Sequence, residues 1–169
     1  MGSTSEQRTK VELLLWLDYK RAHVAEQVRA MPVEARRSTQ VPSGWTPRGL
    51  VRHLTLDVER LWFRAVMAGE EVQLAEGYDG WRAPEELSDE ELLEQYAQEC
   101  RLATEAVADL DLDAKPLWWF EGAGDAPYSS LREVLVHVLV ETATHAGHLD
   151  LARELADGGQ RLIMDEPES

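Results

Sequence analysis

The sequence predicts an all-α fold, a four-helix bundle whose helices are joined by long crossover connections. Four stretches repeat apolar residues at the three- and four-residue spacing of amphipathic helices. No stretch of useful length alternates apolar and polar residues as a half-buried strand does. The three connections, roughly 14–20 residues each, are longer than antiparallel helix hairpins need. We therefore expect crossovers or functional loops that cover one end of the bundle.

The first two helices have recognisable ends. The first is expected over residues 5–30, and Pro32 ends it because proline cannot continue a helix. Thr46 is a good N-cap and Pro47 a good first residue, so the second helix begins there and runs to about Gly69. The residues expected on or beside the packed face of the first helix are Val11, Leu14, Leu15, Leu17, Asp18, Ala22 and Ala25.

Serine caps open the other two helices. Ser88 and Glu91 have the spacing of a capping box, which predicts a third helix that extends to about Leu110. Ser129 or Ser130 caps the fourth helix, which runs to about Ala156, just before the two glycines at 158–159. The chain length fits a single domain, expected over residues 1–160 and followed by an acidic tail over residues 161–169.

Composition and charge exclude several classes of function. A formal charge of −15 repels the phosphate backbone, so we expect no nucleic-acid partner. No apolar run is long enough for a membrane span, and the polar N-terminus predicts no secretory signal. The single cysteine, Cys100, excludes an internal disulfide and a Cys-rich zinc site and is not marked as reactive. A lone cysteine suits a reducing compartment, so we expect a cytoplasmic protein.

The fourth helix carries titratable residues on the face that is expected to pack on the core. Steps of four and three along it give Val134, Val138, Glu141, His145, His148, Ala152 and Leu155. A buried polar group without a partner costs about 1–3 kcal/mol, and a charge costs more. We therefore expect something to compensate the carboxylate and the two imidazoles, and a bound metal ion is the simplest candidate.

His53 is the expected partner from a facing helix, because it lies one position from the apolar stripe at Leu54. Histidine and glutamate together bind zinc, nickel or iron, and three protein ligands leave positions open for water or substrate. The rival interpretation is a buried polar network in which the carboxylate pairs with an imidazolium and no metal binds. His23 is expected at the surface or boundary. His137 is expected as a hydrogen-bonded boundary residue, with a ligand or a partner of a ligand as the alternative.

Residues 43–54 and 137–148 resemble the DinB superfamily, specifically the actinobacterial DinB-like branch related to the mycothiol-dependent maleylpyruvate isomerases. The segments that carry the resemblance are Ser43-Gly44-Trp45-Thr46-Pro47, Leu50-Val51-Arg52-His53-Leu54 and His137 to His148. It extends over about residues 8–157. It implies a four-helix bundle with unusual crossover connectivity, a homodimer, and a divalent metal held by His53, Glu141 and His145. Many members have histidine in place of Glu141, whereas those isomerases have glutamate. The resemblance favours zinc, with nickel or iron as alternatives.

Characterised relatives use low-molecular-weight thiols, mycothiol or bacillithiol. The resemblance thus implies a metal-dependent thiol S-transferase or isomerase that acts on a small electrophile. His148 is then expected as a proton carrier, a fourth ligand or a partner of a ligand. Trp45 and Trp119 are expected to line the electrophile's side, although Trp119 could instead staple its loop to the core. The alternatives are a non-catalytic metal-binding or stress-response protein of the same fold, and a metal-free bundle that acts through protein contacts.

Overall fold

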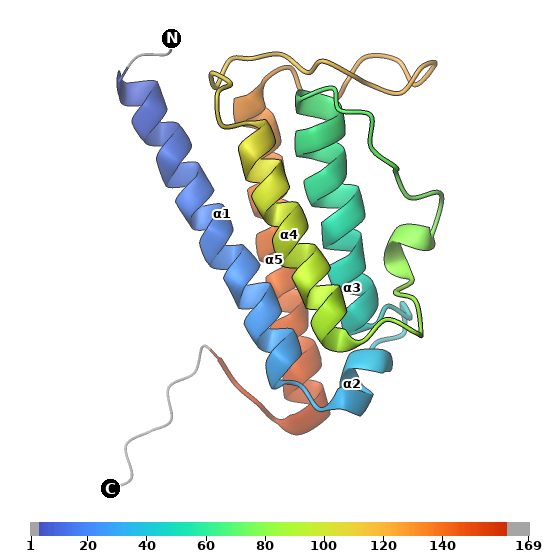
Figure 1. Ribbon diagram of the computed structural model, residues 1–169. Coiled ribbons are helices and arrows are strands. Elements are labelled where there is room, and N and C mark those ends of the chain that lie inside the picture. The colour runs from blue at the N-terminus through green and yellow to red at the C-terminus, as the bar shows by residue number, and fades with distance from the viewer. Residues whose placement is uncertain (1–3, 162–169) are drawn as a thin grey trace, which may run out of the picture.

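The structure, a computed structural model that describes residues 4–161, is a bundle of four long helical columns (Figure 1). No strand occurs within residues 4–161, so the predicted all-α class is confirmed. The helical elements in chain order are α1 (Thr4–Ala30), α2 (Val33–Arg37), α3 (Pro47–His53), η1 (Leu54–Met67), η2 (Asp79–Trp81), α4 (Asp89–Ala106) and α5 (Leu131–Asp157).

The four columns form two parallel pairs. In Figure 1, α1 and α5 descend, whereas α3 with η1 and α4 ascend. Contacts at matching heights hold the first pair together: Arg132 lies 3.7 Å from Glu6, and Arg153 donates to Gln27 at 3.1 Å. Because η1 and α4 are parallel, the chain between them must return along the full length of the bundle. This segment is the long crossover that the sequence predicts.

The structure confirms the predicted N-caps and, with them, the predicted starts of the helices. Thr46 Oγ1 accepts a hydrogen bond from the Gly49 amide at 3.0 Å. Ser88 Oγ accepts from the Glu91 amide, and Glu91 accepts in return from the Ser88 amide, which completes the capping box. At the other end of α5, Gly158 adopts the left-handed conformation that ends many helices, with φ of 75°.

Three helix boundaries differ from the prediction. The second helix is α-helical only to His53 and continues as a π-helix, η1, in which hydrogen bonds span five residues. Pro32 ends α1 as expected, but it also heads the unpredicted short helix α2. The third helix ends at Ala106, before the expected Leu110. Apolar periodicity cannot separate α from π geometry, since both bury one face.

The packed face of α1 also differs from the prediction. Leu17, Val24 and Val28 are fully or almost fully buried, whereas Val11 and Leu15 are 55% and 63% exposed. The prediction that these two residues lie on or beside the packed face was therefore wrong, because the core follows a neighbouring stripe of the same helix.

His23, expected at the surface or boundary, is instead buried at 4% exposure. Its Nε2 lies 2.7 Å from Asp150 on α5, and this partner makes burial of the ring tolerable. A sequence cannot reveal such a partner, because Asp150 lies far along the chain.

A buried ion pair crosses the middle of the bundle. Arg21 of α1 donates to both carboxylate oxygens of Glu59 on η1, at 2.8 and 2.5 Å, and both residues are buried. Cys100 and Tyr96 of α4 lie beside this pair, and burial raises the pKa of both groups well above the usual values. The only thiol of the chain is therefore protonated and shielded from solvent.

The last described residue, Arg161, contacts the first helix. Arg161, the first residue of the expected acidic tail, lies 2.6 Å from Glu26, and the rest of that tail lies outside the described residues. Within residues 4–161, no helix is both long and apolar enough to cross a membrane.

The buried pair yields a stability prediction. Glu59→Ala leaves Arg21 buried without its main partner, which typically costs about 3–5 kcal/mol. We expect a loss of this size in the free energy of unfolding, measured by urea denaturation. Glu94→Ala removes the exposed partner of Arg101 and serves as the control, with an expected change below about 1 kcal/mol. Equal losses in the two variants would contradict the importance of the buried pair.

Candidate metal centre

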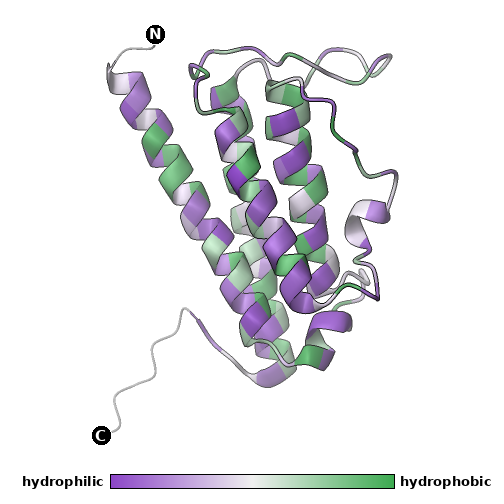
Figure 2. Cartoon of the chain, in the orientation of Figure 1, coloured by the Kyte–Doolittle hydropathy of each residue, from purple (hydrophilic) through white to green (hydrophobic). Residues whose placement is uncertain are grey.

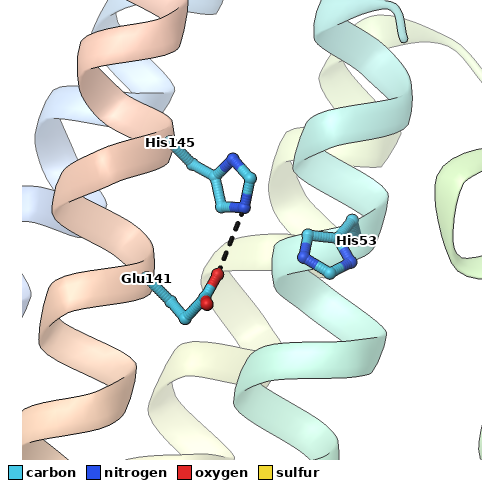
Figure 3. A group of neighbouring side chains, drawn as sticks. All are labelled: His53, Glu141 and His145. Carbon is cyan, nitrogen blue, oxygen red and sulfur yellow. Dashed lines mark ion pairs between the residues drawn. The ribbon is translucent and has the colours of Figure 1, made fainter. Parts of the chain in front are cut away.

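Three side chains from two neighbouring helices meet between α3 and α5. His53 is the last residue of α3, and Glu141 and His145 lie one turn apart on α5. Figure 3 shows the three side chains pointing toward one another across the gap between these helices. One nitrogen or oxygen of each lies within 4.8 Å of those of the other two. We call these three residues the donor group.

The composition and spacing of the donor group fit a divalent cation. Zinc binds imidazole nitrogen and carboxylate oxygen at about 2.0–2.2 Å, so ligand atoms around one ion lie about 3–4 Å apart. The donor atoms lie within 4.8 Å of one another, which is close to that spacing. Two imidazoles and one carboxylate suit zinc, nickel or iron better than magnesium or calcium, which prefer oxygen.

The donor group lies at the edge of the core and not within it. The side chain of His145 is 12% exposed and that of Glu141 is 38% exposed, and Leu155, predicted on the same packed stripe, is 67% exposed. The buried face of α5 consists instead of Leu131, Val134, Leu135, Val138, Thr142, Ala146, Leu149 and Ala152. The premise that the whole titratable stripe is buried was therefore wrong. An edge position lowers the desolvation cost of these groups and leaves one side open.

His145 lies between two neighbours on its own helix. Its Nε2 is 3.3 Å from Glu141, and its Nδ1 is 3.4 Å from Nδ1 of His148. Burial lowers the pKa of His145 to about 4, and the nearby His53 contributes to the same shift to a smaller extent. The imidazole is therefore neutral at pH 7, which is the form that coordinates a metal.

His53 has partners that the sequence analysis missed. Its Nδ1 lies 2.8 Å from the carboxylate of Asp57, four residues further along. The indole of Trp81, in η2, stacks on the imidazole with ring centroids 4.0 Å apart and planes inclined by 13°. The spacing of His53 and Asp57 is a readable signal for a contact across one turn. No sequence signal leads to Trp81, which the crossover brings back to α3.

The structure places His148 and Trp45 together beside the donor group. His148 is exposed and approaches Nδ1 of His145, on the edge of that ring away from Glu141. It is not a member of the donor group. The ring centroids of Trp45 and His148 are 6.1 Å apart.

Trp119 lies in a second aromatic cluster, on the other side of the donor group along α5. The rings of Trp119 and Trp62 are stacked, with centroids 5.7 Å apart. Trp62 also contacts His137 and Tyr128. The hydroxyl of Tyr128 lies 2.9 Å from Nδ1 of His137, so His137 is a hydrogen-bonded boundary residue as expected. Among the described ring contacts, none joins Trp119 to His53 or His145.

A comparison with protein families assigns the chain. The family model described as mycothiol S-transferase matches residues 12–158, which include every residue of the donor group. No curated protein and no solved structure matches the chain. The family match extends over most of the sequence, and it agrees with the DinB-like resemblance of the two histidine-bearing segments. The chain therefore belongs to the mycothiol S-transferase family, one of the DinB-like families.

Proposed function

We propose that the protein is a divalent-metal-dependent transferase that joins a low-molecular-weight thiol of the mycothiol type to a small electrophile. The observation that supports this most strongly is the donor group, which lies in a chain of the mycothiol S-transferase family. His53, Glu141 and His145 would hold the ion. Three protein donors leave coordination positions open, which is typical of catalytic rather than structural zinc sites.

The chemistry requires removal of the thiol proton and attack by sulfur. When bound to the donor group, a divalent ion, with zinc favoured over nickel or iron, acts as a Lewis acid that lowers the pKa of a thiol. The thiol loses its proton, the sulfur bonds to the electrophilic carbon, and the leaving group departs with the electron pair of the broken bond. Glu141 is the most exposed donor, so substrates would approach from its side.

The neighbouring side chains suit the remaining steps. His148 is exposed and lies beside His145 without belonging to the donor group, so it leaves the open positions free and could carry the thiol proton to solvent. Trp45 flanks His148, and Trp119 with Trp62 forms an apolar wall further along α5. We assign these aromatic residues to the side of the electrophile. A cytoplasmic location, where both Cys100 and the substrate thiol stay reduced, is part of the proposal.

We further propose that the protein forms a homodimer through the outer side of the α1–α5 pair. Trp16 and Tyr19 on α1 are 61% and 53% exposed, and Val136 and Val140 on α5 are 46% and 57% exposed. Figure 2 shows an apolar stretch in the N-terminal half of α1, the half that also carries the exposed Val11 and Leu15. Gly147 of α5 has open space around the position of a Cβ, so packing within the chain does not explain a glycine that weakens the helix. Close approach of a second copy would explain it.

Metal content tests the donor group. Protein purified without chelator is expected to contain about one zinc, nickel or iron ion per chain, measured by plasma mass spectrometry. His53→Ala and His145→Ala are expected to reduce this content to nearly zero, whereas His148→Ala and His137→Ala keep it. A metal content near zero that His53→Ala does not change would contradict the metal proposal. It would favour a metal-free polar network built on the contacts of His53 with Asp57 and of His145 with Glu141.

Turnover tests the enzyme proposal and the role of His148. With mycothiol and monochlorobimane, the metal-loaded protein is expected to form the thioether and release chloride faster than metal-free protein. His148→Ala is expected to keep its metal and lower kcat on the order of 100-fold, with partial rescue by added imidazole. Absence of any rate above the metal-free background, for every thiol tested, would favour a non-catalytic metal-binding protein.

Sedimentation tests the dimer surface. Trp16→Glu and Val140→Glu place charges in the proposed interface, and both are expected to convert the dimer to a monomer in analytical ultracentrifugation. Tyr78→Glu, at a residue that is 78% exposed on the crossover, is the control and should remain dimeric. A wild-type protein that sediments as a monomer at micromolar concentration would refute this part of the proposal.

A further inference from the structure

The crossover between η1 and α4 lies directly on the helix that carries His53. Its residues 79–81 form the short helix η2, which we call the strap. Arg52 Nε donates a hydrogen bond to the backbone oxygen of Asp79 at 3.1 Å. Trp81, at the other end of the strap, stacks on His53. Both ends of the strap are therefore attached to α3, one at Arg52 and the other at the donor histidine.

Two glycines allow this close approach. Gly80 lies against the carboxylate of Asp57, and a Cβ at Gly80 would collide with that carboxylate. Gly49 of α3 lies against the backbone oxygen of Trp81, where a Cβ would also collide. Close packing, and not backbone conformation, explains both glycines, since neither has a positive φ. The constraint is firm at Gly49, which meets backbone, and weaker at Gly80, which meets the end of a side chain. The fit of the strap over Asp57 is thus specified by the sequence.

The strap and Asp57 together restrict the ring of His53. Asp57 lies 2.8 Å from Nδ1, the indole of Trp81 covers one ring face, and the ring of His145 meets it edge-on at 5.1 Å. The side chains of His53 and Asp57 are only 15% and 28% exposed. An exposed pair at this helical spacing contributes little to stability and leaves the ring free to turn. Because the strap covers Asp57 and the indole covers the ring, the ring loses that freedom.

We propose that Asp57 and the strap form a positioning assembly for His53. Asp57 accepts a hydrogen bond from Nδ1–H of His53, and this fixes the tautomer whose Nε2 lone pair is free for the donor group. Gly80 keeps the strap down on Asp57, and Trp81 holds the plane of the ring. The carboxylate of Asp57 also adds a second negative charge to that of Glu141, so that a divalent ion would be neutralised. Asp57 is thus a positioning residue that acts through His53.

The identity of what His53 binds rests on the proposed function, whereas the tautomer of His53 does not. Long-range proton–nitrogen NMR spectra of the metal-free protein at pH 8 report which ring nitrogen carries the proton. We expect the Nδ1–H tautomer for His53 in the wild type, and loss of its predominance in Asp57→Ala. A predominant Nε2–H tautomer in the wild type would overturn the assignment, whether or not the protein binds metal.

Zinc affinity, measured by competition with a chromophoric chelator, provides the second readout. Asp57→Ala is expected to weaken zinc binding 10- to 100-fold. Gly80→Ala keeps the carboxyl group in the sequence but places a Cβ against it, so that the carboxylate turns away or the strap lifts. Either movement breaks the assembly and should weaken binding in the same direction. This variant carries the test if Asp57→Ala does not fold. Asp79→Ala is the matched control, because it removes a negative charge from the same strap while its backbone contact with Arg52 remains.

The outcomes separate the two proposals. Unchanged affinity and an unchanged tautomer in Asp57→Ala would overturn the positioning role even if the wild type binds zinc tightly. Equal weakening by Asp79→Ala and Asp57→Ala would also overturn it, because a general electrostatic effect would then suffice. Absence of zinc binding in the wild type, with the expected change of tautomer in Asp57→Ala, would refute the metal proposal and support the positioning role.

Discussion

The packing of α3 and η1 against α5 is the constraint on which the candidate site depends, because its donors come from distant parts of the chain. Leu54 and Val58 on one side and Val138 on the other are buried close to the donors in sequence. A slip of one helical turn moves a side chain by about 5.4 Å, which is enough to separate His53 from Glu141 and His145. Burial of apolar side chains therefore sets the heights at which the polar ones meet.

The position of the donor group at the edge of the core reconciles it with folding. Each of its histidines already has a carboxylate neighbour, since His53 contacts Asp57 and His145 contacts Glu141. Partial exposure lowers the desolvation cost that full burial would impose. By contrast, the Arg21–Glu59 pair is buried, and its stability depends on the geometry of the two hydrogen bonds between these side chains. The bundle thus keeps its structural charges inside and its candidate chemistry at the boundary.

The sequence predicted those features that are local or periodic. Caps at Thr46 and Ser88, and the repeat of apolar residues, located the helices because their physical causes lie within a few residues. The donor group could also be predicted, because three titratable residues fall on helix faces that were expected to pack together. Partners that depend on the tertiary fold could not be predicted. The contact of Trp81 with His53 depends on the path of the crossover, and burial of His23 depends on Asp150. The change to a π-helix after His53 has no periodic signature.

The place of Cys100 has a consequence if the protein acts on electrophiles as proposed. A reagent that alkylates a substrate thiol can also alkylate the enzyme, and the rate of that side reaction follows the exposure and thiolate fraction of its own cysteines. Here the single sulfhydryl lies within the bundle beside Tyr96 and the Arg21–Glu59 pair, and its pKa is raised by burial. Self-inactivation would therefore require the bundle to open first. The durability of the protein during turnover would then follow its conformational stability, and not the reactivity of the electrophile.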